Sequence, residues 1–285
     1  MTAIILDGIV LGLQFGVLAV GLTLVYGLGG VLNLAYGQMA VVAAIVVSLS
    51  MDAGLPAAPA VGIGLLAGGG FGLLLDTTLL RPVYRLRGEA KVLLSLVLTL
   101  GVAFVVDGLL LWRLPLEALT LHIGGGVVEI LGVPMRRGSL WASAISVAVF
   151  VALFFFFRST MLGRAVRSVI QDEEGARLVG IDPGRMRTLI LVSSGVLAAL
   201  VAVTRSMTTP VTVTAGISLT IFALIVTVVG GLGSVAGAFL AGLILGIIST
   251  VSSFYIGTFL TLIILLSAAA LTILMRPSGL LGVPE

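Results

Sequence analysis

The sequence predicts an all-α integral membrane protein with about eight or nine transmembrane helices. Of its 285 residues, 59% are hydrophobic and 9% are charged, and the mean hydropathy is +1.30. A soluble domain carries about 25% charged residues, so this chain has too little polar surface for a water-facing globule. The 38 glycines agree with a membrane bundle, because small residues let transmembrane helices approach each other closely.

Apolar runs divide the chain into candidate spans. A transmembrane helix needs about 20 mostly apolar residues. The segments that approach this length are residues 4–26, 34–51, 57–80, 90–111, 139–157, 188–204, 216–232, 235–252 and 257–275. We expect one or two of them to be half-helices or re-entrant segments. Residues 1–10 have no basic n-region, so we expect them to begin the first span and not to form a signal peptide.

Basic residues predict the orientation of the spans. Eleven of the fifteen lysines and arginines lie in residues 81–91, in residues 158–187 or at Arg276. The positive-inside rule places these segments in the cytoplasm, with the N-terminus outside and residues 112–138 as an external loop of a single domain, 1–285. Within this loop, residues 127–130 and 133–134 predict a short β-hairpin. The loop is either a docking surface or a solvated connector.

Two glycine-broken stretches interrupt the apolar pattern, at residues 26–38 and 229–237. Matching interruptions in two halves of a chain are typical of transporters whose broken helices line the substrate pathway. The candidate pathway residues are Asn33, Tyr36, Gln38, Thr227, Gly230, Gly231, Gly233 and Ser234. The alternative is that these residues form tight turns, helix caps and glycine packing contacts.

The acidic residues and the missing motifs limit how transport could be driven. Asp7, Asp76 and Asp107 fall near span ends, where we expect water or headgroups to solvate them, so proton coupling through a buried acid is disfavoured. The sequence contains no P-loop motif for nucleotide phosphates. If ATP drives transport, another subunit binds it. We therefore expect a non-catalytic transport chain. We also expect no nucleic-acid binding, because the sequence has no basic stripe interleaved with aromatic residues.

Residues 158–187 form the longest charged interruption, with six arginines and four acids. Asp172 to Gly180 predicts a short helix with acids in its first turn and glycine at its end. Asp182 and Pro183 predict the N-cap and first residue of the next helix. The candidate contacts to a soluble motor subunit are Asp172, Glu173, Glu174, Gly175, Ala176, Gly180 and Asp182. The alternative is a solvated loop that only satisfies the positive-inside rule.

Several short motifs, taken in order, carry a family resemblance. They are GLTLVYG at 21–27, NLAYG at 33–37, Arg81-Pro82, MLGRAVR at 161–167, ARLVGID at 176–182, GGLGSVAGA at 230–238 and RPSGLLG at 276–282. In their order and spacing, the chain resembles the LivH-like permease subunits of ABC importers for branched-chain amino acids.

The resemblance implies a set of partners in the bacterial inner membrane. These are a second, LivM-like permease, two ATP-binding cassette subunits that hold ATP and magnesium, and an extracytoplasmic substrate-binding protein. It also implies that residues 174–180 dock on an ATPase subunit and that this chain binds no cofactor. The alternatives are a urea or short-chain amide permease, a self-contained secondary carrier, or a membrane scaffold without transport.

Overall fold

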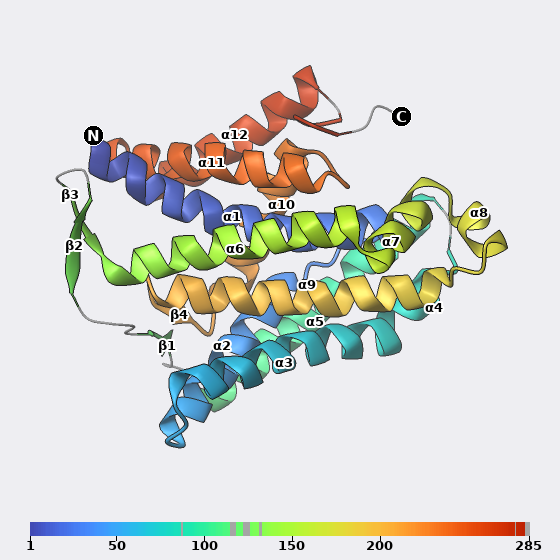
Figure 1. Cartoon of the computed structure of the whole chain (residues 1–285), viewed down its shortest axis with the longest axis horizontal. Helices are drawn as coiled ribbons and strands as arrows, with labels where there is room; N and C mark the ends of the chain where they lie inside the picture. Colours follow the sequence, from blue (N-terminus) through green and yellow to red (C-terminus); the bar gives the residue numbers. More distant parts are fainter. Residues whose placement is uncertain (87, 115–117, 122–125, 131–132, 277, 283–285) are drawn as a thin grey trace.

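Nine apolar helices of the described chain form a bundle in the computed structural model (Figure 1). The structure describes the chain apart from residues 87, 115–117, 122–125, 131–132, 277 and 283–285. Seven helices of the described chain are long enough to span a membrane. They are α1 (Thr2–Gly29), α3 (Ala57–Leu75) with its extension to Val83, α5 (Glu89–Arg113), α6 (Arg137–Ser159), α9 (Pro183–Ser206), α11 (Val235–Tyr255) and α12 (Thr258–Met275).

Two apolar helices are shorter, α2 (Tyr36–Asp52) and α10 (Ala215–Gly230). Each of the nine predicted segments therefore corresponds to an apolar helix, and two of them are of reduced length, as expected. The first break is shorter than predicted, because α1 continues to Gly29 and leaves only residues 30–35 outside helices.

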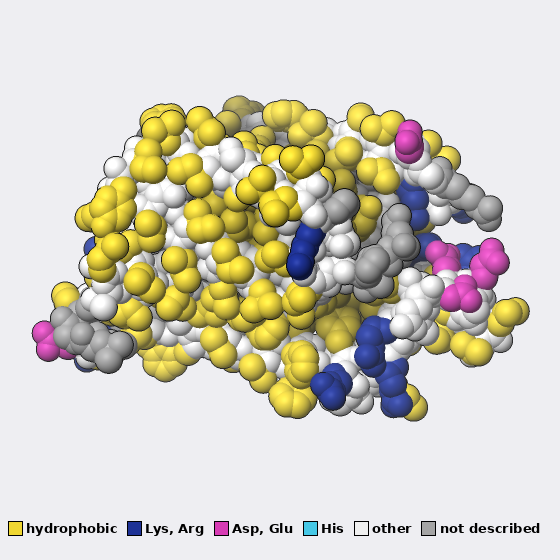
Figure 2. Space-filling model, turned by 90° about the horizontal axis from the view of Figure 1, so that it is seen from above, with side chains coloured by type: hydrophobic (Ala, Val, Ile, Leu, Met, Phe, Trp, Pro, Cys, Tyr) yellow, Lys and Arg dark blue, Asp and Glu magenta, His cyan; other side chains and the backbone are white. Residues whose placement is uncertain are grey.

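Charged segments gather at one end of the bundle, which we call the basic end (Figure 2). It carries the connection between α4 (Arg81–Val83) and α5, the amphipathic helix α7 (Met161–Gln171) and the short helix α8 (Glu173–Leu178). Hydrophobic side chains cover the length of the bundle seen in the same figure. The sequence predicted α8 but not α7, which begins at the N-cap Thr160 and buries Val166 and Val169.

The opposite end, which we call the hairpin end, carries the strands (Figure 1). Strand β2 (Val127–Ile130) pairs antiparallel with β3 (Val133–Arg136), which confirms the predicted hairpin. Strand β1 (Ala118–Leu119) pairs with β4 (Val211–Thr212), from the segment between α9 and α10. Parts of the predicted external loop, residues 115–117, 122–125 and 131–132, lie outside the described residues.

Glycines set the closest helix contacts in the core. Helix α1 lies at the centre and packs along α11. A Cβ atom added to Gly12 would meet the Leu243 backbone at 2.8 Å, and one added to Gly246 would overlap Gly12. Gly68 of α3 and Gly195 of α9 meet in the same way. These close approaches hold the bundle together by backbone packing, as in other membrane helix pairs.

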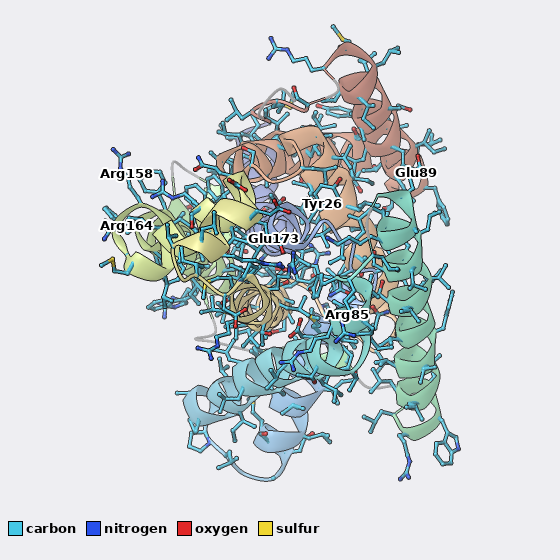
Figure 3. All side chains as sticks on the ribbon, turned by 90° about the vertical axis from the view of Figure 1, so that its right-hand side faces the viewer. Tyr26, Arg85, Glu89, Arg158, Arg164 and Glu173 are labelled. Carbon is cyan, nitrogen blue, oxygen red and sulfur yellow. The ribbon has the colours of Figure 1, made fainter. Side chains whose placement is uncertain are left out.

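Three helices form the rim of the bundle. In the most apolar window of α5, α6 and α12, only 17%, 11% and 17% of residues are buried, against 61% for α1 and α9. Figure 3 shows α5 at the edge, oblique to the helices around α1. These three helices therefore present their side chains to lipid or to another subunit.

The third span ends in a π-helical turn, η1 (Asp76–Leu80), before α4. Asp76 is 1% exposed and accepts a hydrogen bond from Thr188 of α9. The expectation that Asp76 is solvated is therefore wrong, because the π-turn directs its carboxylate against α9. Isolated π-turns in helices are frequent at functional sites.

Candidate functional site

The first break turns the chain back into the bundle after α1. Gly30 caps α1 with a left-handed conformation (φ 58°), and its N–H donates to the carbonyl of Tyr26 at 2.7 Å. The next residues contact α5, where the N–H of Leu32 donates to Ser95 and that of Leu34 donates to Thr99. Thr99 lies ten residues after Glu89, or about 15 Å along α5. Helix α2 therefore begins well inside the bundle.

Helix α10 begins beside the start of α2. The hydroxyl of Thr220 accepts from the N–H of Gly37 at 2.8 Å and lies 3.2 Å from the carbonyl of Leu34. A Cβ on Gly37 would overlap the carbonyl oxygen of Gly216. The N-terminal turns of two short helices thus meet backbone to backbone, and we call this contact the half-helix junction (residues 33–38 and 215–220).

The three polar residues predicted for the first stretch are fully buried at this junction. Asn33, Tyr36 and Gln38 are each 0% exposed. The Asn33 side-chain oxygen accepts from the N–H of Ala35 at 3.0 Å, and the Gln38 amide nitrogen donates to Asp107 of α5 at 3.2 Å. The Tyr36 hydroxyl fits against Gly21 of α1. These side chains line an internal contact between α2, α5 and α10, and not a helix end at the membrane surface.

The second predicted stretch lies nearer the basic end. Ser234 accepts from the N–H of Gly237 and caps α11, and Thr227 donates to the carbonyl of Ala19 in α1. Gly230 and Gly231 pack against the C-terminal segment, where the N–H of Leu281 donates to the carbonyl of Gly230. The two stretches approach each other at Gly27 and Gly233. A Cβ atom added to Gly27 would lie 3.1 Å from the Cα atom of Gly233. Their polar side chains, however, bond to different helices.

The charged segment forms two linked helices at the basic end. Asp172 caps α8 by accepting from the N–H of Glu174 at 3.0 Å, and Asp182 caps α9 by accepting from that of Gly184 at 2.9 Å. Gly180 ends the turn with φ 86°. The cap at Asp182 and the glycine stop follow the sequence prediction, whereas Asp172, predicted to lie in the first turn of α8, is its N-cap. Gly175 packs on the Asp172 side chain, and Ala176 is the buried residue of α8.

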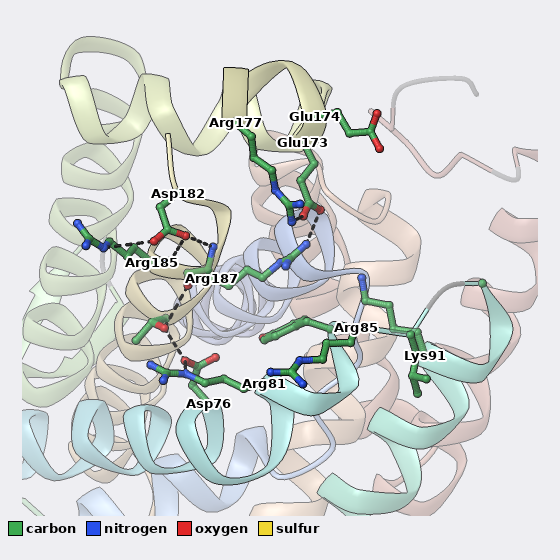
Figure 4. A pocket seen from close by; sticks show the side chains of 15 residues that line it. Asp76, Arg81, Arg85, Lys91, Glu173, Glu174, Arg177, Asp182, Arg185 and Arg187 are labelled. Atoms are coloured by element: carbon green, nitrogen blue, oxygen red, sulfur yellow. Dashed lines mark hydrogen bonds and ion pairs between the residues drawn. The ribbon is translucent and has the colours of Figure 1, made fainter. Parts of the chain in front are cut away.

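Glu173 and Glu174 point in different directions (Figure 4). Glu173 bonds to Arg177 at 2.7 Å and to Arg187 at the start of α9, whereas Glu174 is exposed. The Arg187 guanidinium also stacks over the Tyr84 ring, 4.8 Å from its centroid. Seen from the basic end, Glu173 lies at the centre of the bundle (Figure 3). Glu173 therefore ties α8 to the transmembrane helices.

A charged cavity of about 950 Å³ opens beside this ion pair. Its lining includes Asp76, Arg81, Arg85, Lys91, Glu173 and Arg187. Lys91 lies near the turn at Gly30. A Cβ atom added to Gly30 would be 3.4 Å from the amino nitrogen of Lys91. A cation near the C-terminus of α1 complements the helix dipole. The cavity thus lies between α8, the π-turn and the starts of α5 and α9.

The sequence model of the family described as "branched-chain amino acid transport system / permease component" matches residues 4–275 of the chain. The chain belongs to this family. It is a multi-pass inner-membrane protein of the ABC permease type, as the apolar helices and the family show together.

Curated relatives of the permease carry transport names. BraD of Pseudomonas aeruginosa, a high-affinity branched-chain amino acid permease protein, is 28% identical over 70% of this chain and 68% of its own length. LivH of Escherichia coli, with the same description, is 27% identical over 69% and 68%. The fructose import permease protein FruG of Bifidobacterium longum is 27% identical over 66% of this chain and 54% of its own.

A solved structure shares the fold of the permease. PsaBC from Streptococcus pneumoniae in complex with Fab superimposes with a TM-score of 0.52 at 13% identity, over 95% of this chain and 91% of that one. At this identity the likeness concerns the fold alone.

Sequence patterns missed several residues of the permease that the fold brings together. Thr220, Ser95, Thr99 and Asp107 bond to the first break or to α2 from distant parts of the sequence. Asp107 is half-buried near the end of α5, which is compatible with the expected solvation, and one oxygen of its carboxylate also accepts from the buried Gln38. A polar residue every four positions in α5, at Ser95 and Thr99, was the available signal. Among the described residues, no three His, Cys, Asp or Glu side chains gather as a metal site.

Proposed function

We propose that this permease imports branched-chain or related hydrophobic amino acids as one half of an ABC importer, with ATP and magnesium bound on partner subunits. The observation that carries the proposal is the match of the family over residues 4–275, together with relatives named for branched-chain amino acid transport. Those names extend to this chain as an inference from similarity. The chain itself then acts as a non-catalytic channel-forming subunit.

A second, LivM-like permease covers part of the rim in this proposal. The best candidate surface is α5, which exposes Phe104 and Val105 and leaves open space around Gly101 and Gly108. These four residues recur at a spacing of three to four and so share one face of the helix. Glycines with free space allow a partner helix to approach closely. Helix α12 exposes its apolar side chains on the same rim.

An ATP-binding cassette subunit docks at the basic end, which the positive-inside rule assigns to the cytoplasm. The C-terminal end of α8 exposes Leu178 (89%) and Val179 (74%) beside charged residues, beyond the apolar body of the bundle. Exposed aliphatic side chains next to water are typical of a docking surface. Motion of α8 reaches α9 through Glu173 and Arg187, and α9 contacts the π-turn through Thr188 and Asp76.

The substrate-binding protein meets the hairpin end in the same arrangement. This end carries β2 and β3 within the proposed external loop 112–138 of a single permease domain. The proposed coupling loop, residues 158–187, lies at the opposite end. Alternating access then means that the half-helix junction opens between these two ends.

A different substrate class has some support of its own. FruG is named for fructose import, so one relative of this chain is named for a sugar. Urea and short amides are a further class, since the family motifs do not distinguish them. A self-contained secondary carrier differs from all of these, because it needs no ATP-binding partner.

Purification from the native membrane tests the proposal. The tagged permease is extracted in mild detergent, and the attached proteins are identified by mass spectrometry. We expect a second permease and ATP-binding cassette subunits to co-purify, and the companion binding protein to bind leucine, isoleucine or valine. A chain that comes away alone, or a companion that binds only fructose or urea, would contradict the proposal.

A further inference from the structure

Asp107 is a carboxylate within a rim helix. Three leucines, Leu109 to Leu111, separate it from the polar end of α5, and Arg113 lies six residues, or about 9 Å, further along. Its side chain is half-buried. An ionised group among apolar residues of a span is costly and generally faces protein or water, not lipid. No ion pair to Asp107 is found among the described side chains.

Gln38 connects this carboxylate to the half-helix junction. Its amide nitrogen donates to one oxygen of Asp107 at 3.2 Å. The same amide lies against the first turn of α10, where a Cβ on Gly216 would be 2.6 Å from the Gln38 nitrogen. Its amide oxygen is buried and accepts no hydrogen bond from the residues that the structure describes. Gln38 therefore presents a free acceptor beside Asp107.

The N-termini of α2 and α10 bring donors to the same place. The N-cap residues, Ala35 and Thr214, provide no side-chain cap. The first N–H groups of a helix lack intrahelical acceptors and carry the positive end of its dipole. The amide nitrogen of Asn33 is a further donor that is fully buried and unpartnered within the described structure. The first turns of α2 and α10 lie side by side at this junction, with the N–H of Gly37 bonded to Thr220 in this conformation, and the positive end of a helix favours an anion.

We propose that the half-helix junction binds the headgroup of the amino-acid substrate. Asp107 and the Gln38 oxygen receive the ammonium, and the first turns of α2 and α10 with the Asn33 amide receive the carboxylate. This inference rests on the proposed function and names the residues that recognise a zwitterion. A zwitterion matches the site because it carries an ammonium group with three N–H donors and a carboxylate. A sugar or a neutral amide has no ammonium group to pair with the Asp107 carboxylate.

The contact between Gly37 and Gly216 closes the junction in this conformation. The headgroup enters when α2 and α10 separate, and the Thr220 bonds to Gly37 and Leu34 are the contacts that must break. Opening and recognition therefore occur at the same few residues.

The complete importer, reconstituted in proteoliposomes with its leucine-loaded binding protein, tests this assignment. Uptake of labelled leucine and ATP hydrolysis are measured for the wild type and for Asp107→Asn. Asparagine keeps an acceptor for Gln38 but removes the charge. We expect uptake to fall about tenfold or more, while stimulation of ATP hydrolysis by the loaded binding protein stays within about twofold of the wild type.

Three further variants make the result decisive. Asp52→Asn, at an exposed position, should leave uptake unchanged, and Asp107→Glu should retain part of the uptake. Gln38→Leu should lower uptake even if Asp107→Asn fails to assemble. Normal uptake by Asp107→Asn or by Gln38→Leu, or loss of ATPase stimulation in step with uptake by an assembled Asp107→Asn complex, would overturn the assignment. If the wild type imports no amino acid, the proposed function itself fails.

Discussion

At the scale of single residues, adjacent acids have different roles. Glu173 bonds to Arg177 and Arg187, and Arg187 stacks on Tyr84, whereas Glu174 is exposed. Both acids suit the first turn of α8, so the sequence could not tell them apart. The separation comes from α9, whose second turn presents Arg187 to only one of them.

Replacing each acid by glutamine tests this difference. We expect Glu173→Gln to reduce the stimulation of ATP hydrolysis by the loaded binding protein about threefold to tenfold, because it removes the charge that holds Arg187. Glu174→Gln serves as the matched control and should stay near the wild type. Equal effects in the assembled importer would show that the Glu173–Arg187 contact does not transmit the motion of α8.

Local and non-local signals explain which residues the sequence revealed. The cap Asp182 and the stop at Gly180 depend on neighbours within a few residues, and both were predicted. Thr220 and Asp107 contact the first break and Gln38 across long sequence separations. A single sequence contains no pattern that reports such pairs, so these residues required the fold.

At the scale of elements, the two short helices distinguish this fold from a simple bundle. The glycine clusters predicted the ends of α1 and α10 to within about three residues, because glycine ends helices locally. The start of α10 at Ala215 lies within one residue of the predicted segment 216–232. Helix α7 was missed because its arginines made the segment look like a loop.

The junction between the two short helices tolerates no added side-chain atoms. In Gly37→Ala, the new methyl group would overlap the carbonyl of Gly216 and force α2 and α10 apart. We expect import to fall about tenfold or more, with a lower thermal midpoint. Gly62→Ala in α3 is the control, because the space around Gly62 is open. Transport by Gly37→Ala at the wild-type level would mean that the junction does not have to close.

The α1–α11 contact contributes stability and not recognition. Gly12→Val would place two methyl groups into the backbone of Leu243 and should cost about 2 kcal/mol or more. We expect a clear decrease in the thermal midpoint of the detergent-purified chain. Gly70→Val, whose surroundings are open, should unfold near the wild-type temperature. A similar midpoint for both variants would rule out close α1–α11 packing.

At the scale of the whole molecule, composition was enough to predict the class. A chain with 9% charged residues and nine apolar segments has few alternatives to a membrane bundle. Composition could not predict which helices occupy the centre. That arrangement follows from glycine contacts such as Gly12–Gly246 and Gly68–Gly195, which place α1 and α9 inside and leave α5, α6 and α12 at the rim.

The central claim is that this chain transports only as part of an ATP-driven assembly. The most direct measurement compares leucine uptake into proteoliposomes that contain the complete importer with uptake into those that contain only its permease subunits. We predict uptake that requires ATP, the loaded binding protein and the ATP-binding cassette subunits. Leucine uptake by this chain alone, driven by an ion gradient or by none, would contradict the account.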